Sequence, residues 1–351
     1  MFAIDKHSTT MIGSVPYKSS DDTFAALDEW PLSIPAWPQL PKRSFRETMI
    51  PQYAEGFPGI TFDETEKRVF VDTSRDLLGD IGTFYENALA ENTAPFAVSE
   101  EHALGLHAFL DRLRKNGGRL PIIKGQVTGP FTFGLGLNDQ DLKAVWFDPE
   151  YRDVVLKGLT MKALWQFDEL SKLAEKVIIF FDEPILSALG TPAYMSVQDE
   201  DVIAALNEVI NAVQAKGAAV GVHCCGNMDW SLLARTDVDI MSFDAYFYGE
   251  KLALYPKEID AHLAKGGYLA WGIVPTAGHT AGETPADNET VDSLQKKLGD
   301  LLALFVGKGV DEDHLRNRMI LTPSCGMGTL TPESTAKVLE LLAGLNAVTS
   351  A

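Results

Sequence analysis

From about residue 118 onward, short apolar runs alternate with longer segments that have the spacing of amphipathic helices. The apolar runs that we interpret as β-strands are residues 120–124, 176–181, 218–223, 239–243, 268–271 and 318–322. The helical segments between and after them are approximately residues 150–175, 199–216, 228–236, 254–265, 287–309 and 332–346. Strands that alternate with helices in this way are typical of a parallel sheet.

The number of strands favours a barrel. Residues 9–12 form an earlier apolar run, and residues 60–62 are a further candidate, which brings the total to about eight strands. The alternative is a doubly wound open sheet, but no Gly-x-Gly-x-x-Gly turn follows any expected strand. The predicted fold class is therefore α/β, a (β/α)8 TIM barrel.

Residues 18–117 are less regular. They contain a proline-rich stretch at 30–41 and two helical sections near 74–92 and 99–116. The Trp and Leu content of the stretch is too apolar for a solvated tether. We expect an irregular arm with extra helices, packed on the barrel, within a single domain that covers residues 1–351.

Composition limits the classes of partner. The formal net charge of −19 disfavours nucleic acids and anionic membrane surfaces as partners, because both repel a strongly acidic protein. No run approaches 18 apolar residues, and residues 1–20 do not resemble a secretion signal, so a cytoplasmic protein is expected. The 3 cysteines suit a reducing compartment.

The cysteines also suggest chemistry. His223 and Cys225 end the strand expected at 218–223, and alternation along a strand points both to one face and Cys224 to the other. Cys325 follows the strand expected at 318–322, so two distant strands can end at one point. Imidazole and thiolates are zinc ligands. The plainer alternative is that these cysteines are small buried core residues.

Acidic residues end two other expected strands. Asp182 and Glu183 follow the run at 176–181 and could hold a substrate ammonium group or a proton; alternatively, Asp182 caps the next helix. Asp244 follows the run at 239–243, on the strand expected beside the His-x-Cys pair. It could supply a fourth, oxygen ligand to zinc, or orient His223 from behind.

The turn after the first expected strand contains Ile12, Gly13 and Ser14. Backbone N–H groups and a hydroxyl in such a turn suit a carboxylate. A Gly-Ser pair before a nearby proline is also an ordinary turn.

Taken together, these segments resemble the catalytic, C-terminal half of cobalamin-independent methionine synthase, within the superfamily that includes uroporphyrinogen decarboxylase and corrinoid-linked methyltransferases. The resemblance extends from residue 9 to about residue 345. It rests on six segments in the family's order: TTMIGSVP (9–16), GQVTGPFT (125–132), FDEP (181–184), HCC (223–225), IMSFD (240–244) and PSCG (323–326).

The resemblance implies roles for particular residues. Zinc would be held by His223, Cys225, Cys325 and Asp244, although family members usually have Glu at the position of Asp244. Homocysteine would be held at its amino-acid end by Asp182, by Ser14 and by the backbone of Ile12 and Gly13. A family Glu that also holds the substrate amine appears here as Gln52, and a neutral amide attracts an ammonium group less.

Two departures bear on the methyl donor. The folate-using enzymes have a second, N-terminal barrel, and the histidine that they place after the penultimate strand is replaced around residues 270–275. The chain is therefore similar to the stand-alone, folate-independent core enzymes, whose donor is methylcobalamin or another methylcorrinoid, free or on a corrinoid protein. The resemblance implies a zinc-dependent methyltransferase that forms methionine from homocysteine.

Three other functions stay open. The acceptor could be another small thiol such as coenzyme M, although an acidic residue beside a carboxylate-binding turn suits an amino acid better. A lyase like uroporphyrinogen decarboxylase would need arginines for a substrate with many carboxylates, and the N-terminal region offers few, among them Arg43, Arg46 and Arg68. A zinc-binding protein without catalysis is the fourth reading.

Overall fold

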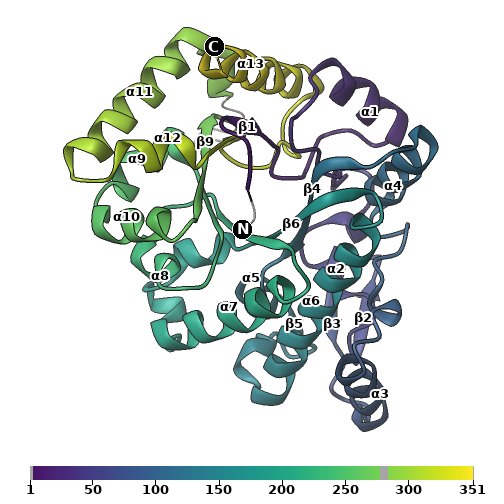
Figure 1. The fold of residues 1–351 in the computed structure, drawn as a ribbon. Coiled ribbons are helices and arrows are strands. Elements are labelled where there is room, and N and C mark those ends of the chain that lie inside the picture. The colour runs from purple at the N-terminus through teal and green to yellow at the C-terminus, as the bar shows by residue number, and fades with distance from the viewer. Residues whose placement is uncertain (1–2, 277–283, 351) are drawn as a thin grey trace.

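The computed structural model describes residues 3–276 and 284–350, and its centre is a parallel sheet of seven strands. Figure 1 shows helices surrounding these strands, which confirms the α/β class and the barrel type of fold. The strands, in their order across the sheet, are β1 (Ser8–Thr9), β10 (Met319–Pro323), β9 (Tyr268–Val274), β8 (Ile240–Phe243), β7 (Ala219–Cys224), β6 (Ala174–Asp182) and β4 (Leu120–Thr128).

Each helical segment expected from the sequence contains a helix in the structure. These are α3 (Leu78–Leu89), α4 (Leu104–Asn116), α6 (Pro149–Leu170), α7 (Asp199–Gln214), α8 (Trp230–Ala234), α10 (Pro256–Ala264), α11 (Val291–Gly307) and α13 (Pro332–Ser350). Five helices were not expected: α1 (Ser20–Glu29), α2 (Pro51–Ala54), α5 (Pro130–Gly136), α9 (Ala245–Leu252) and α12 (Glu312–Asn317). No helix in the described part of the chain is long and apolar enough to span a membrane.

The eighth position of the barrel is filled by residues 34–39, from the proline-rich stretch. The Ile34 amide donates to the Thr9 carbonyl (2.9 Å), and the Lys124 amide donates to the Pro35 carbonyl (2.9 Å), so this segment lies between β1 and β4. Isolated parallel bridges join Ala36 to Lys124 and Ser14 to Gln39. A proline has no N–H to donate, which prevents a continuous ladder here.

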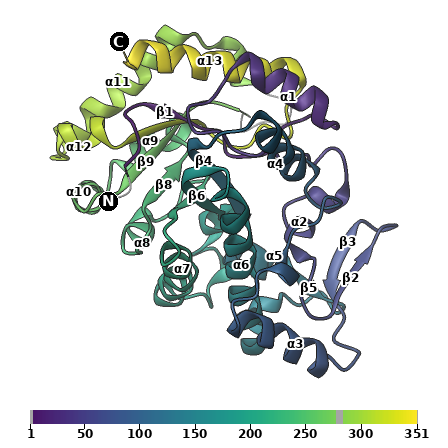
Figure 2. The ribbon, with the colours of Figure 1, turned by 45° about the vertical axis from the view of Figure 1, so that its right-hand side comes forward.

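This arrangement corrects two expectations. The stretch at 30–41 was expected to be only an irregular arm, yet part of it closes the barrel. Residues 60–62 were a candidate barrel strand, but β2 (Ile60–Asp63) belongs to a separate three-stranded sheet with β3 (Arg68–Val71) and β5 (Asn138–Asp139). Figure 2 shows β2 and β3 at the periphery, away from the barrel strands.

Buried polar side chains hold the barrel together where the ladder is interrupted. The Lys124 ammonium donates to the Ile12 carbonyl (2.6 Å), and Gln126 Nε2 donates to the Trp37 carbonyl (2.9 Å). Behind them, the Tyr53 hydroxyl and Gln166 Nε2 both donate to the Gln126 carbonyl. We call these contacts, which join residues 34–39 and the turn after β1 to β4, α2 and α6, the seam.

The barrel interior also includes the closing segment. Ile34 packs in one buried apolar cluster with side chains of the strands, among them Ile178, Phe180, Ile240 and Ile320. A second, larger cluster lies between the strands and the surrounding helices. Ile34 therefore faces the barrel interior, whereas Trp37 packs in the outer cluster and donates to Gln166 of α6 (3.0 Å), so the segment has an inner and an outer face as a barrel strand does.

Candidate metal centre and substrate cavity

Three potential metal ligands meet at the carboxyl end of the barrel. His223 lies on β7, Cys225 directly follows β7, and Cys325 follows β10; one ligand atom from each lies within 4.8 Å of the other two. A tetrahedral zinc ion with Zn–S bonds near 2.3 Å would bring its sulfur ligands to about 3.8 Å from each other. Small side-chain adjustments therefore suffice to form three zinc bonds.

The imidazole of His223 is oriented for this role. Its Nδ1 contacts the Ser242 hydroxyl at 2.9 Å, whereas Nε2 is buried and has no hydrogen-bond partner. An unpaired buried polar atom is costly, so such atoms in native proteins usually have a ligand or a role. A neutral imidazole whose Nδ1–H is held by Ser242 leaves the Nε2 lone pair free for a metal.

The two thiols are electrostatically linked. A hydrogen bond from Cys325 and the nearby His223 lower the pKa of Cys225, against the effect of its burial. The pKa of Cys325 moves in the opposite direction, because it would have to ionise beside the Cys225 thiolate. One thiolate forms readily in this cluster, and a bound divalent cation would favour the second.

Cys224 lies apart from the cluster. Its side chain is fully buried, its Sγ lies 3.7 Å from the Gly226 carbonyl, and burial raises its pKa to about 12. Adjacent residues of a strand face opposite sides, which separates Cys224 from His223 and Cys225.

Asp182 ends β6 close to the cluster. It is 5% exposed, and its Oδ1 is buried without a partner. Burial raises the pKa of this carboxyl to about 6, while Lys124 and His223 hold it down. The next turn, Pro184–Ala188, begins after Glu183 and has no side-chain cap, so Asp182 is left free to meet a ligand.

Glu183, predicted as a substrate-binding residue, is occupied within the protein. Its carboxylate accepts hydrogen bonds from the amides of Phe131 and Thr132 and from the Thr132 hydroxyl, at the start of α5. Gly129 is required beside it, since a Cβ there would lie 2.4 Å from Glu183 Oε1. A substrate-binding role for Glu183 stays a prediction.

Asp244 is not among the three clustered ligands. Its carboxylate accepts from the Phe247 amide (2.9 Å) and caps α9, and burial raises its pKa to about 7. The charges of Cys225 and His223 both influence its ionisation, so it lies near the cluster. A fourth zinc bond from Asp244 stays a prediction, as does the alternative that it only supports the site.

The turn that contains Ile12, Gly13 and Ser14 borders the same cavity. Ile12 and Ser14 line it, and Ser14 Oγ accepts a hydrogen bond from the Gly328 amide (3.2 Å). The Ser14 hydroxyl can therefore donate its own proton to a ligand. Gly13 packs against Gln39, since a Cβ added to Gly13 would lie 2.4 Å from Gln39 Oε1.

Gln52 does not line the cavity. It is fully buried in α2, accepts from Gln39 Nε2 (2.7 Å) and donates to the His102 carbonyl (2.9 Å). Gln39, at the carboxyl end of the closing segment, lines the cavity instead. Sequence reasoning missed Gln39, because its segment does not look like a strand.

The cavity has a volume of about 450 Å3 and two kinds of wall. We call the side formed by strand ends the barrel wall: Ile12, Ser14, Asp182, His223, Cys225 and Cys325. The arm wall comes from residues 39–49: Gln39, Pro41, Lys42, Glu47 and Met49. No arm-wall residue was predicted to belong to the site.

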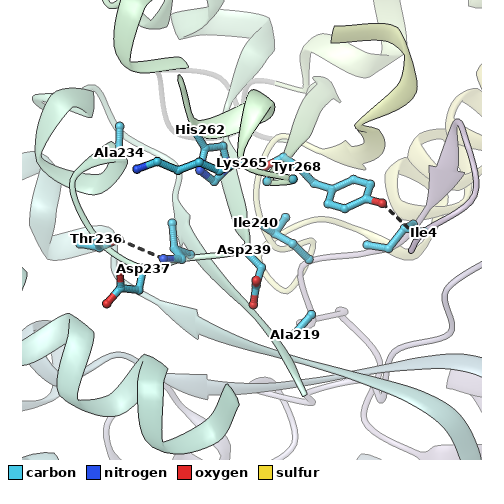
Figure 3. Close-up of a pocket in the computed structure, with 13 residues that line it drawn as sticks. Ile4, Ala219, Ala234, Thr236, Asp237, Asp239, Ile240, His262, Lys265 and Tyr268 are labelled. Atoms are coloured by element: carbon cyan, nitrogen blue, oxygen red, sulfur yellow. Dashed lines mark hydrogen bonds between the residues drawn. The ribbon is translucent and has the colours of Figure 1, made fainter. Parts of the chain in front are cut away.

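A second cavity of about 390 Å3 lies at the amino ends of β8 and β9 (Figure 3). Asp239 Oδ2 there accepts from the Val220 amide and from Gln214, and His262 Nε2 contacts the Tyr268 carbonyl. Among the described residues, none of the unpaired buried side-chain atoms belongs to this cavity. Active sites of barrel enzymes lie at the carboxyl ends of the strands, so the cavity beside the thiols is the candidate site.

Comparison with known proteins gives structural neighbours only. No protein-family model matches the chain, and no curated protein sequence matches it. A B12-independent methionine synthase from Shewanella sp. W3-18-1, in complex with selenomethionine, is similar with a TM-score of 0.59 and 17% identity, covering 98% of each chain. A methyltransferase from Methanosarcina mazei gives a TM-score of 0.54 and 16% identity, covering 99% of this chain and 94% of that one.

At such low identity these neighbours establish the fold. Both similarities extend over nearly the whole of this chain, so they include the closing segment and the arm as well as the regular strands. A barrel fold hosts many chemistries, and function must be argued from the site.

Proposed function

We propose that this protein is a zinc-dependent methyltransferase that moves a methyl group from a methylcorrinoid to the thiol of homocysteine, forming methionine. The observation that carries the proposal is the unpaired, buried Nε2 of His223 beside the thiols of Cys225 and Cys325. A donor set of one imidazole and two thiolates suits zinc better than magnesium or calcium. The two structural neighbours, which are named as a methionine synthase and a methyltransferase, agree with this chemistry.

Zinc, when bound, would lower the pKa of the acceptor thiol and so supply a nucleophile at neutral pH. The protein's residues bind and orient the acceptor. The unpaired Oδ1 of Asp182 would accept a hydrogen bond from the ammonium group. Ser14 and the backbone of Ile12 and Gly13 would receive the carboxylate.

The methyl donor would approach from the arm wall. Met49 lines the cavity and is 42% exposed, so the cavity reaches the surface there. In the proposed transfer, the acceptor sulfur would form a bond to the methyl carbon while the bond from that carbon to the donor's cobalt breaks, and the electron pair of that bond would stay with the donor. The thiol proton passes to solvent.

The choice of a corrinoid rests on the resemblance to folate-independent enzymes, whereas the Shewanella neighbour is named B12-independent. The donor is therefore the first part of the proposal to test. The zinc-loaded protein is incubated with homocysteine and either methylcobalamin or methyltetrahydrofolate, and methionine is measured. We expect methionine from methylcobalamin alone.

Other results would change the proposal in defined ways. Methionine from methyltetrahydrofolate would refute the corrinoid donor, and equal activity of the zinc-free protein would refute the metal's role. If neither donor yields methionine from homocysteine although zinc is bound, but coenzyme M gives a methylated product, the acceptor is a different thiol.

A further inference from the structure

Lys124 is a buried cation inside the barrel, and its hydrogen-bond partners among the described residues are both neutral. Its side chain is fully buried, and its ammonium lies 4.7 Å from the centre of the Phe180 ring. It donates to the Ile12 carbonyl (2.6 Å) and to Gln126 Oε1 (3.1 Å). A buried charge without a paired counter-ion is costly in free energy, so an anion bound nearby would be stabilised by Lys124.

The ammonium keeps most of its charge at neutral pH. Burial lowers the pKa of Lys124 to about 8, and the charge of Asp182, at the end of the adjacent strand β6, opposes this decrease. Lys124 does not line the cavity, but Ile12, whose carbonyl it holds, does. A positive charge therefore lies directly behind the turn that borders the cavity.

The carbonyls of this turn are all used within the protein. Each carbonyl of residues 12–14 accepts a hydrogen bond from another segment: from Lys124 Nζ (2.6 Å), the Gln39 amide (3.0 Å) and the Met327 amide (2.8 Å), in that order. The amides of Gly13 and Ser14, in contrast, take part in no hydrogen bond among the described residues. Backbone donors that are left free in a turn beside a cavity suit an anion.

Lys124 determines the direction of one of these amides. The N–H and C=O groups of a trans peptide point in opposite directions. Because the Ile12 carbonyl is directed at Lys124, the Gly13 amide of the same peptide is directed away from it. Without the ammonium group, this carbonyl would lose its donor and the peptide would be free to rotate.

We propose that Lys124 is a positioning residue for the acceptor: it holds residues 12–14 in the conformation that receives a carboxylate, and its charge attracts that carboxylate. The inference rests on the proposed function, because it concerns the acceptor of that same site. Thiols that carry a carboxylate should depend on Lys124, whereas thiols without one should not.

The test compares two acceptors that differ only in the carboxylate, homocysteine and 3-aminopropane-1-thiol. Their dissociation constants are measured by titration calorimetry on the zinc-loaded wild-type protein, on Lys124→Met and on Lys124→Gln. Methionine removes both the donor and the charge. Glutamine also removes the charge but retains a polar group beside Gln126, so it serves as the second variant if the first does not fold.

Gln166→Leu is the matched control. It removes two hydrogen bonds between buried groups in the same part of the barrel, the one to the Gln126 carbonyl (2.9 Å) and the one from Trp37 Nε1 (3.0 Å). Neither of these bonds reaches residues 12–14. The control therefore weakens the seam without changing the charge behind the turn.

We expect both Lys124 variants to weaken homocysteine binding about ten-fold or more, as the loss of a charged interaction does, and to change aminopropanethiol binding less than about two-fold. Gln166→Leu should leave both constants unchanged. A purely structural role of Lys124 would weaken both thiols alike. Zinc content should match the wild type in all variants, since none of them replaces a proposed zinc ligand.

Unchanged homocysteine binding in the folded Lys124 variants, or equal weakening of both thiols, would overturn the role of Lys124 while the proposed function stands. Equal affinity of the wild type for the two thiols would also overturn it, because the turn would then receive no carboxylate. If the zinc-loaded wild type binds neither thiol, the proposed function fails, and the inference fails with it.

Discussion

The two walls of the cavity are built in different ways. The barrel wall is made of strand ends, whose backbones are fixed by a regular parallel ladder. The arm wall follows a proline-interrupted segment that is fixed by side-chain hydrogen bonds, such as those of Lys124 and Gln126 in the seam. A binding site can therefore depend on a part of the chain that has almost no regular secondary structure.

The largest expected effect is on the barrel wall. Cys225→Ser and Cys325→Ser each remove a sulfur from the cluster, and we expect zinc affinity to fall more than about a hundred-fold, from one ion per chain to nearly none. Metal content after dialysis measures this. Cys224→Ser is the matched control, since its side chain lies outside the cluster; equal zinc loss there would contradict the assignment of ligands.

Removal of the Lys124 ammonium group from the seam should have the next largest effect, on the stability of the fold. Lys124→Met leaves the Ile12 carbonyl and Gln126 Oε1 without their donor, and we expect the free energy of unfolding to fall by about 2–4 kcal/mol. The relief of a buried charge offsets part of the cost. Urea unfolding measures the change, with Lys172→Met as the exposed control. Equal effects of the two substitutions would show that the seam contributes little.

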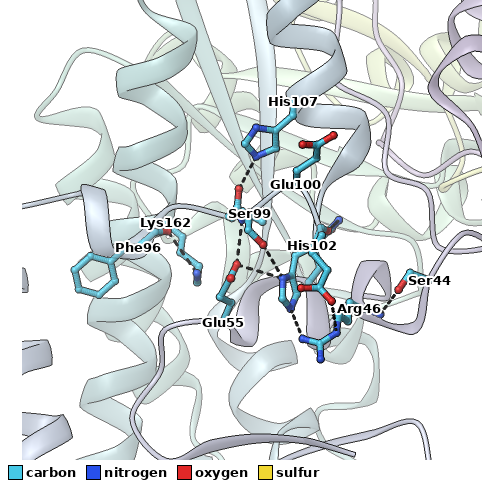
Figure 4. Close-up of polar contacts among 12 residues, drawn as sticks. Ser44, Arg46, Glu55, Phe96, Ser99, Glu100, His102, His107 and Lys162 are labelled. Atoms are coloured by element: carbon cyan, nitrogen blue, oxygen red, sulfur yellow. Dashed lines mark hydrogen bonds and ion pairs between the residues drawn. The ribbon is translucent and has the colours of Figure 1, made fainter. Parts of the chain in front are cut away.

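The contact between Glu55 and His102 (Figure 4) should make the stability of the fold depend on pH. Burial of Glu55 opposes ionisation, but hydrogen bonds from His102 and Ser99 outweigh it and lower the pKa of Glu55 to about 2. A carboxyl whose pKa is lower in the folded state stabilises the fold above its unfolded pKa, near 4.5, and loses that effect as pH falls towards 2. The stability difference between the wild type and Glu55→Gln should therefore shrink through this window.

Melting temperatures of both proteins between pH 6 and pH 3 test this expectation. The partly exposed Glu55 makes the effect modest, because solvent screens the pair. A difference that stays constant across the range would mean that the His102 contact does not stabilise the arm.

The smallest expected effect is that of one hydroxyl in the seam. Tyr53→Phe removes a hydrogen bond to the Gln126 carbonyl (2.7 Å), which keeps its second donor, Gln166. We expect a loss of about 1 kcal/mol in urea unfolding. Tyr151→Phe, which removes a 2.6 Å bond to the Pro58 carbonyl outside the seam, is the comparison. A larger loss for Tyr53 would show that the seam hydrogen bonds act cooperatively.

The sequence predicts the barrel wall much better than the arm wall. The apolar runs before Asp182 and His223 indicate buried strands, and the position of a polar residue at a strand end follows from the parallel topology. Residues 34–39 show no such run, because prolines interrupt them. Prolines cannot donate ladder hydrogen bonds, and side-chain hydrogen bonds such as that of Lys124 hold the segment instead. Their eighth position in the barrel depends on contacts with β1 and β4, which lie far away along the chain.

The same reason explains what was missed in the site. Gln39 and Glu47 are ordinary polar residues in an irregular stretch, and only their burial against the cavity distinguishes them. Gln52 was matched to a substrate-binding position by nearby sequence, whereas the structure places Gln39 between Gln52 and the cavity. For Glu183, the local pattern did not reveal that α5 already occupies both carboxylate oxygens.

The pairing of β1 with β10 sets an order of assembly. Ser8 lies beside Ile320 and Thr9 beside Leu321, so a nascent chain must be synthesised beyond residue 321 before these partners can meet. Contacts between such distant residues are slow to form, because a long loop has to close first. Cys325 follows β10, which is joined to β7 and His223 through β9 and β8, so the three metal ligands can meet before β1 pairs. Zinc uptake during refolding would therefore report the pairing of β7 to β10, and it could precede the closure of the barrel by β1.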